Sequence, residues 1–166
     1  EGTNQVRWTR QQGLPSDDTG TVAAAPDGSV WFAVGNNGAG GAVRFDGTNF
    51  FLLTEKEGLH TGEVTCIGIV PDGRVWFGTA EGTVARFDGR SFTYFDTSSA
   101  LSGRENSAAN ANGHCNDIQQ GPDGATWFGT QDRLWRFEEN TFRQYSREDG
   151  LAADGIALLS APDRSL

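Results

Sequence analysis

The sequence predicts an all-β protein built from repeated four-stranded antiparallel sheets. The first observation is a phrase that occurs three times, as PDGSVWFAV from Pro26, PDGRVWFGT from Pro71 and PDGATWFGT from Pro122. The second is a series of short runs rich in Val, Thr, Phe, Tyr and Trp, which glycine and aspartate separate. The third is that no sustained 3.6-residue hydrophobic period appears, so we expect almost no helix.

Two further markers keep the same order and show that the repeat covers the whole chain, with a period of about 45 residues. RFDG begins at Arg44 and Arg86 and returns as RFEE at Arg136. The dipeptide Gly-Leu begins at Gly13 and Gly58, and again at residue 150. Three markers held in register predict one repeated structural unit.

The second unit shows how each repeat is expected to fold. Its four strand-like runs are Val64–Val70, Val75–Thr79, Thr83–Asp88 and Ser91–Thr97. PDG joins the first run to the second and FDG joins the third to the fourth. Both are turn sequences, because Asp bonds to nearby backbone and Gly accepts a positive φ.

Four antiparallel strands, repeated about every 45 residues, are typical of a β-propeller blade. We therefore predict a propeller segment made of three complete four-stranded blades with parts of flanking blades. The expected outer strand of the preceding blade lies near Val6–Thr9, and the expected inner strand of the following blade at Ile156–Ala161. The complete blades are about 19–54, 64–97 and 115–146, with 1–12 and 155–166 in incomplete blades.

A Trp-Phe pair occupies one position of the second strand in every unit. Neighbouring residues of a strand point to opposite faces, so each blade presents Trp to one neighbour and Phe to the other. We interpret the pair as packing between blades, with an aromatic platform for a ligand as the alternative. The pairs are Trp31 with Phe32, Trp76 with Phe77 and Trp127 with Phe128.

At these residues the sequence resembles the two-component regulator propeller repeat. The resemblance rests on PDGRVWFGT, GTVARFDGRSFTYF and EGLHTGEV, and covers almost the entire chain. A weaker resemblance, to streptogramin lyase propellers, rests on the PDG-x-x-WF phrases. The first resemblance implies a propeller of bacterial cell-envelope proteins, often the extracytoplasmic sensing part of a histidine kinase. Such sensors commonly recognise glycans or other small ligands.

Composition narrows the classes of partner. The chain has 166 residues and a net charge of −9, which argues against nucleic acids and anionic lipid surfaces because both require basic patches. No apolar run approaches the roughly 20 residues of a membrane helix, so we expect no membrane insertion of this segment. The sequence contains no Met, and we expect that it begins after processing or inside a longer protein.

An arc of fewer than four blades leaves aromatic faces open at both ends, whereas closed propellers have about four to eight blades. We expect the ring to be completed by the remaining blades of a longer parent chain or by a second copy. A tight four-bladed closure is a third alternative.

The two cysteines, Cys66 and Cys115, have the same strand parity in neighbouring units. Side chains of equal parity point to the same side of their own blades, so we expect that the two thiols do not face each other and form no disulfide.

The expected binding face carries the loops between blades and the loops between second and third strands. Both long insertions, at Gly35–Gly41 and Ser102–His114, fall on it, and insertions gathered on one face often mark a binding surface. Neutral drift in tolerant loops is the alternative interpretation. The candidate ligand-binding residues are Asp17, Asp18, Asn36, Asn37, His60, Glu63, Arg104, Asn112, His114, Asp132 and Arg133.

Catalytic chemistry is weakly represented. The sequence has no Ser-His-Asp arrangement, no nucleophile elbow and no zinc-ligand spacing. We predict a non-catalytic ligand-binding and sensing module without a cofactor or metal, which takes a glycan or small molecule. The alternatives are a structural propeller in a surface assembly and a propeller lyase, which would require a His base beside a divalent metal.

Overall fold

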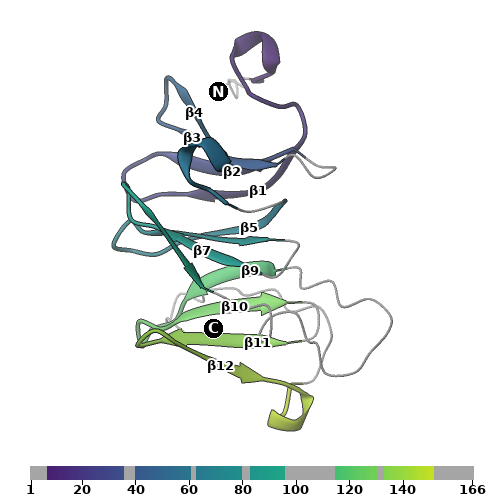
Figure 1. Cartoon of the computed structure of the whole chain (residues 1–166), viewed down its shortest axis with the longest axis vertical. Helices are drawn as coiled ribbons and strands as arrows, with labels where there is room; N and C mark the ends of the chain where they lie inside the picture. The colour runs from purple at the N-terminus through teal and green to yellow at the C-terminus, as the bar shows by residue number, and fades with distance from the viewer. Residues whose placement is uncertain are drawn as a thin grey trace, which may run out of the picture.

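The computed structural model describes residues 7–35, 40–60, 63–79, 83–95, 115–130 and 133–151. Three four-stranded antiparallel sheets follow one another along the chain, each in the strand order of the sequence (Figure 1). Apart from three short 3-10 turns, the described residues contain no helix. The all-β prediction with three complete blades is therefore confirmed.

The sheets are named blades 1, 2 and 3 in chain order. Blade 1 comprises β1 (Thr19–Ala24), β2 (Val30–Val34), β3 (Gly41–Phe45) and β4 (Phe50–Leu53). Blade 2 comprises β5 (Val64–Ile69), β6 (Val75–Thr79), β7 (Val84–Phe87) and β8 (Phe92–Phe95). Blade 3 comprises β9 (Cys115–Gln120), β10 (Thr126–Thr130), β11 (Leu134–Glu138) and β12 (Thr141–Tyr145).

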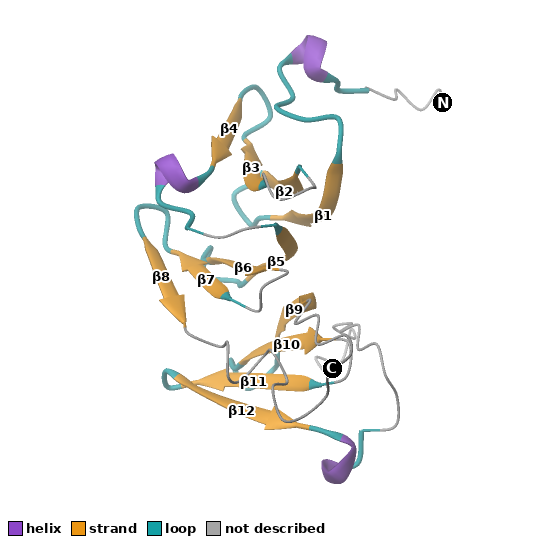
Figure 2. Cartoon of the chain, turned by 45° about the vertical axis from the view of Figure 1, so that its right-hand side comes forward, coloured by secondary structure: helices purple, strands orange, loops and turns teal. Residues whose placement is uncertain are grey.

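The blades fan out from their inner strands. β1 contacts β5, and β5 contacts β9, so the first strands of successive blades lie side by side. The outer strands β4, β8 and β12 lie on the opposite side of the stack and spread apart (Figure 2). This radial arrangement of wedge-shaped sheets is the architecture of a β-propeller.

The Trp-Phe pairs hold the blades together. The ring of Trp31 lies 5.9 Å from that of Phe77 in blade 2, and the ring of Trp76 lies 5.4 Å from that of Phe128 in blade 3. Trp76 is only 2% exposed. At the last blade, Trp127 is half-buried and packs against Tyr145 of its own sheet. The packing interpretation is thus confirmed for both interfaces between the described blades.

Glycine is required where the inner strands meet. A Cβ atom added to Gly68 of β5 would lie 2.4 Å from the Cβ of Ile118 in β9. Real Cβ atoms do not approach so closely, so any side chain at position 68 would push blades 2 and 3 apart.

The PDG turns are built as the sequence predicts. Asp27, Asp72 and Asp123 each accept the backbone N–H of the residue two positions later, at 2.9–3.1 Å. In the FDG turns, Asp46 and Asp88 accept backbone N–H groups in the same way. These side-chain bonds fix the turns that align the strands.

The turn from β11 to β12 departs from this pattern. Its central residues, Glu139 and Asn140, have φ values of 49° and 61°, which is the type I′ geometry of a two-residue hairpin. Asn tolerates this left-handed backbone, whereas Glu is strained there.

We expect the double substitution Glu139→Asn with Asn140→Gly to raise the free energy of unfolding by about 1 kcal/mol, because Asn-Gly is the preferred type I′ pair. Urea unfolding followed by circular dichroism measures the change. The same pair introduced at Arg90 and Ser91, in the FDG turn of blade 2, is the control and should not stabilise the protein. Lower stability of the blade 3 variant would contradict the assigned turn geometry.

The Gly-Leu marker ends a capped 3-10 turn. Thr9, Thr54 and Ser146 each begin such a turn with a capping box, and a glycine ends each turn in the left-handed conformation. The buried Leu59 after the second turn joins the core between blades 1 and 2. The marker therefore has a structural cause at the entry to the next blade.

The prediction for the cysteines is wrong. Cys66 of β5 and Cys115 of β9 form a disulfide, with their Cα atoms 5.7 Å apart. Both cysteines are buried, with exposures of 1% and 2%. The bond joins the inner strands of blades 2 and 3.

A β-bulge explains the error. Each inner strand carries one extra residue near its start, where the pairing register with the second strand shifts. Cys115 lies opposite Thr130 and Asp117 lies opposite Gly129, so the bulge places Cys115 and Asp117 on opposite faces. Cys66 occupies the position of Asp117 in its own blade and faces blade 3, while Cys115 faces back to blade 2.

Of the expected outer strand near Val6–Thr9, the structure describes Arg7–Thr9, which form no strand. Trp8 nevertheless packs on Phe45 and Phe50 of blade 1, at 5.3 and 5.4 Å between ring centroids. Phe95 packs in the same way on the corresponding phenylalanines of blade 3.

Residues 155–166, with the expected strand Ile156–Ala161, lie outside the described residues. No described helix has the length and apolar character needed to cross a membrane.

Candidate functional site

Five of the predicted site residues are described by the structure: Asp17, Asp18, His60, Glu63 and Arg133. The others lie outside the described residues; they are Asn36, Asn37, Arg104, Asn112, His114 and Asp132.

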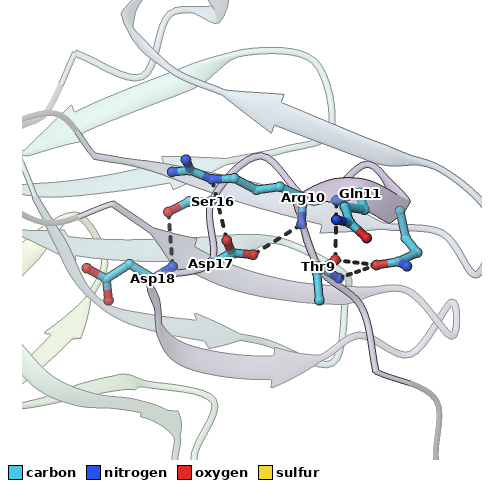
Figure 3. Close-up of polar contacts among 7 residues, drawn as sticks. Thr9, Arg10, Gln11, Ser16, Asp17 and Asp18 are labelled. Atoms are coloured by element: carbon cyan, nitrogen blue, oxygen red, sulfur yellow. Dashed lines mark hydrogen bonds and ion pairs between the residues drawn. The ribbon is translucent and has the colours of Figure 1, made fainter.

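The segment that leads into blade 1 positions Asp17 and Asp18 (Figure 3). The backbone N–H of Arg10 donates to Asp17 Oδ1 at 3.1 Å, and Arg10 Nε lies 3.8 Å from Asp17 Oδ2. The backbone N–H of Asp18 donates to Ser16 Oγ at 3.1 Å, and its carbonyl accepts the N–H of Gly35 at 3.1 Å. Asp17 is therefore engaged by Arg10, while backbone bonds hold Asp18 in place.

A pocket of about 400 Å³ lies beside Asp18. Arg10, Ser16 and Asp18 line it together with the glycine backbone of Gly35 and Gly40. Glu63 adjoins this region, since a Cβ atom added to Gly40 would lie 3.3 Å from the Cα of Glu63. Arg10 was not among the predicted residues, although its place in the capped turn T-x-x-Q could have indicated it.

His60 lies in a different environment. Its backbone N–H donates to the hydroxyl of Tyr94 at 2.8 Å, and the two rings are 5.8 Å apart. The Tyr94 hydroxyl in turn donates to the carbonyl of Gly58. Burial raises the pKa of Tyr94. These contacts connect the entry to blade 2 with its outer strand, which is a structural role.

Arg133 directly precedes β11, the third strand of blade 3. Its carbonyl accepts the backbone N–H of Thr130 at 2.9 Å and the Thr130 hydroxyl at 3.0 Å. Among the described residues, no group of three His, Cys, Asp or Glu side chains is placed to hold a metal ion.

The opposite face, which carries the PDG turns, contains an ion-pair pattern that the sequence reasoning missed. The aspartate of PDG binds the arginine of RFD or RFE in two blades. Arg44 Nη2 lies 3.0 Å from Asp27, and Arg136 Nη2 lies 2.8 Å from Asp123. Each arginine therefore links the two turn regions of its blade.

Blade 2 breaks the pattern because Arg74 follows its PDG turn. Arg74 Nε donates to Asp72 Oδ2 at 2.7 Å and takes the place of the RFD arginine. That arginine, Arg86, lies 5.4 Å over the rings of both Trp76 and Phe95. A single residue after the turn thus changes which arginine the aspartate binds.

The pKa of Asp27 is lowered to about 2, because the Ser29 hydroxyl and N–H donate to it and Arg44 lies beside it. Its folded pKa is below the unfolded value of about 3.9. The contribution of Asp27 to stability is therefore complete above about pH 4 and is lost as the pH falls toward 2.

We expect Asp27→Asn to be less stable than the wild type at neutral pH and to approach it below about pH 3. Urea unfolding of the variant and the wild type at a series of pH values measures the difference in their free energies of unfolding. Asp17→Asn is the control, since the Asp17 carboxylate accepts one backbone N–H, from Arg10 at 3.1 Å, and its ion pair with Arg10 Nε is longer, at 3.8 Å. A constant difference across the series would contradict the assigned interaction.

A groove of about 1080 Å³ lies between blades 1 and 2. Trp31, Leu53 and Phe87 contribute apolar surface, and Asp27, Arg44, Asp72 and Arg90 contribute charge. Phe51 also lines the groove and is 47% exposed. The sequence offered one signal, because Phe51 stands where blades 2 and 3 carry Thr93 and Arg143.

Comparison with known sequences supports the architecture. Residues 58–81 match the two component regulator propeller family. This match begins at the Gly-Leu marker, covers the first two strands of blade 2 and ends two residues after WFGT. The resemblance inferred from the repeat is thereby confirmed. No curated protein matches the chain.

Solved structures share the propeller fold. The extracellular domain of the proposed hybrid two component system BT3049 from B. thetaiotaomicron has a TM-score of 0.66 and 16% identity, covering 92% of this chain and 20% of that one. A virginiamycin B lyase from Staphylococcus aureus, with quinupristin, has a TM-score of 0.55 and 19% identity, covering 80% of this chain and 43% of that one. PorZ, a surface component of the type-IX secretion system of Porphyromonas gingivalis, has a TM-score of 0.56 and 14% identity, covering 89% of this chain and 24% of that one.

The chain therefore spans less than half the length of each of these three solved structures. At such identities the similarity establishes the fold, a propeller module similar to an extracellular domain of a two-component system.

Proposed function

We propose that this chain is a non-catalytic ligand-binding and sensing propeller module of a bacterial cell-envelope or extracellular protein. The observation that carries the proposal is the fit of the three-blade fan to an extracellular two-component domain over 92% of the chain. The family match at residues 58–81 points the same way. The Cys66–Cys115 disulfide supports an extracytoplasmic location, because disulfides persist in oxidising compartments.

The pocket beside Asp18 is the proposed site. A carboxylate, a guanidinium group and exposed glycine backbone can hydrogen-bond to a polar ligand, such as a glycan or another small molecule. The other predicted ligand-binding residues stay part of the proposal and lie outside the described residues: Asn36, Asn37, Arg104, Asn112, His114 and Asp132. Rigid blades would hold the loops in fixed relative positions.

A glycan array tests the sugar-binding version directly. We expect hits that weaken about tenfold in Asp18→Ala, which loses a charged acceptor, and that persist in Arg143→Ala, an exposed residue of β12. An array without hits would count against a sugar ligand. Hits that persist in Asp18→Ala would place the site elsewhere.

The proposed partners are further blades of a longer parent chain, or a second copy that completes the ring. Half-buried Trp127 and Tyr145 support this, because they repeat the face that blade 2 presents to blade 3 through Trp76 and Phe95. Light scattering on the purified chain measures its association. A compact, monodisperse monomer would contradict both versions.

Two comparisons favour other functions. PorZ supports an interaction role in a surface assembly, and regular oligomers by electron microscopy would favour it. The virginiamycin B lyase structure contains a catalytically inactive histidine-to-alanine variant, which supports a lyase as a third candidate. Replacing His60 and His114 with Ala should abolish turnover in a lyase, whereas a binder has no turnover to lose and should stay folded.

A further inference from the structure

The outer edge of blade 1 differs from the other two outer edges. β4 reads FFLL and contains no polar residue, whereas β8 reads FTYF and β12 reads TFRQY. Phe51 and Leu52 are 47% and 40% exposed. Edge strands usually carry charges or proline, which prevent pairing with other chains. β4 has neither, so it lacks the usual protection.

The backbone of β4 is ready to accept a further strand. The N–H of Asp46 donates to the carbonyl of Asn49, which makes these two residues a hydrogen-bonded pair. Pairs alternate along an antiparallel ladder, so Phe51 bonds to β3 while Phe50 and Leu52 direct their N–H and C=O groups to the outer edge. Among the described residues no strand pairs with that edge.

The groove between blades 1 and 2 adjoins this edge. Trp31, Arg44 and Phe51 are cross-strand partners and therefore share the face that borders the groove. A strand added beside β4 would place alternate side chains over this face. The corresponding groove between blades 2 and 3 has a volume of only about 260 Å³. Edge and groove thus occur together at one place in the fold.

We propose that the edge of β4 and the adjoining groove bind an extended, basic peptide segment of a partner protein by β-strand addition. Backbone hydrogen bonds to Phe50 and Leu52 provide affinity, and an apolar side chain entering the groove beside Phe51 provides specificity. The inference does not depend on the proposed loop-face site.

Charge favours a basic peptide over a second copy of the chain. The protein has a net charge of −9, so two copies repel each other. Asp27, Glu57 and Asp72 line the groove together with Arg44 and Arg90, which is an excess of one carboxylate. A peptide that alternates apolar and Lys or Arg side chains complements both the apolar and the acidic surfaces.

A random peptide display library, selected on the full chain, tests the proposal. We expect the enriched peptides to alternate apolar and basic residues. Synthetic copies of these peptides should bind the Phe51→Thr variant about tenfold more weakly than the wild type. This variant carries threonine at position 51, as blade 2 does at the corresponding Thr93. Leu52→Pro should also weaken binding, because it removes an outward N–H while the ladder to β3 stays intact. Thr93→Ala in β8 is the matched control and should bind as the wild type does.

Circular dichroism melting verifies that each variant is folded. The proposal is overturned if selection enriches no peptide, or if the enriched peptides bind Phe51→Thr and Leu52→Pro as tightly as the wild type. It is also overturned if light scattering shows a dimer that Phe51→Thr abolishes, since the occupant is then a second copy.

Discussion

Replacing Trp76 with Ala is expected to lower the free energy of unfolding by about 3–5 kcal/mol. Trp76 is only 2% exposed and touches Phe128 and Phe137 of the next blade, at 5.4 and 5.0 Å between ring centroids. The substitution removes the transfer free energy of a large side chain and leaves a cavity between two blades that cannot close completely. This loss is a large part of the net stability of a typical domain, about 5–15 kcal/mol.

Trp127→Ala is the matched control for this prediction. Trp127 occupies the same position in blade 3 but is half-buried and packs on Tyr145 of its own sheet. Trp127→Ala should lower the free energy of unfolding clearly less than Trp76→Ala does. Urea unfolding followed by circular dichroism measures both variants. If the Trp76 variant does not fold, Trp76→Phe gives a smaller, measurable loss. Equal costs at positions 76 and 127 would contradict the view that these tryptophans stabilise mainly through contact with the following blade.

Removing the disulfide with Cys66→Ala and Cys115→Ala is expected to lower the free energy of unfolding by about 3–4 kcal/mol. The two cysteines are 49 residues apart in the sequence. Without the bond, the unfolded chain gains the conformational freedom of a loop of that length. Both cysteines are buried, so the truncated side chains also leave unfilled space against Gly78.

Equilibrium unfolding without reductant compares the double variant with the wild type. Wild type unfolded in reductant is the control, and it should match the unfolding midpoint of the variant closely. Thiol titration of the denatured, unreduced wild type should detect no free thiol. Two free thiols, or a variant as stable as the wild type, would exclude the bond.

The blades were predictable because their determinants are local and repeated. PDG and FDG set the turns through side-chain bonds, and the alternation of Trp and Phe sets the two faces of each blade. A repeat amplifies such signals, since each unit tests the alignment of the others. The capped turns before Gly13, Gly58 and Gly150 belong to the same class of local signal.

The disulfide and the groove were not predictable in this way. One extra residue in the inner strand reverses the direction of Cys115, and strand parity counted along the sequence does not include such a bulge. The groove forms between two blades, so its size depends on their separation, which no single unit encodes. Asp72 binds Arg74 rather than the arginine of RFD because, of the three PDG turns, only this one is followed directly by an arginine. Of the two predicted aspartates, Asp18 lines a pocket and Asp17 binds Arg10, which also lines that pocket and was not predicted.

The disulfide between Cys66 and Cys115 also means that some blades are held together more firmly than others. Both cysteines of the sequence are used to join blades 2 and 3, so blade 1 has no covalent tie to blade 2 other than the backbone. Under partial denaturation or mechanical tension, blade 1 should separate first, while blades 2 and 3 stay joined through their inner strands. The blade with the apolar edge is therefore the one that can hinge, and a ligand that spans blades 1 and 2 would stiffen that joint.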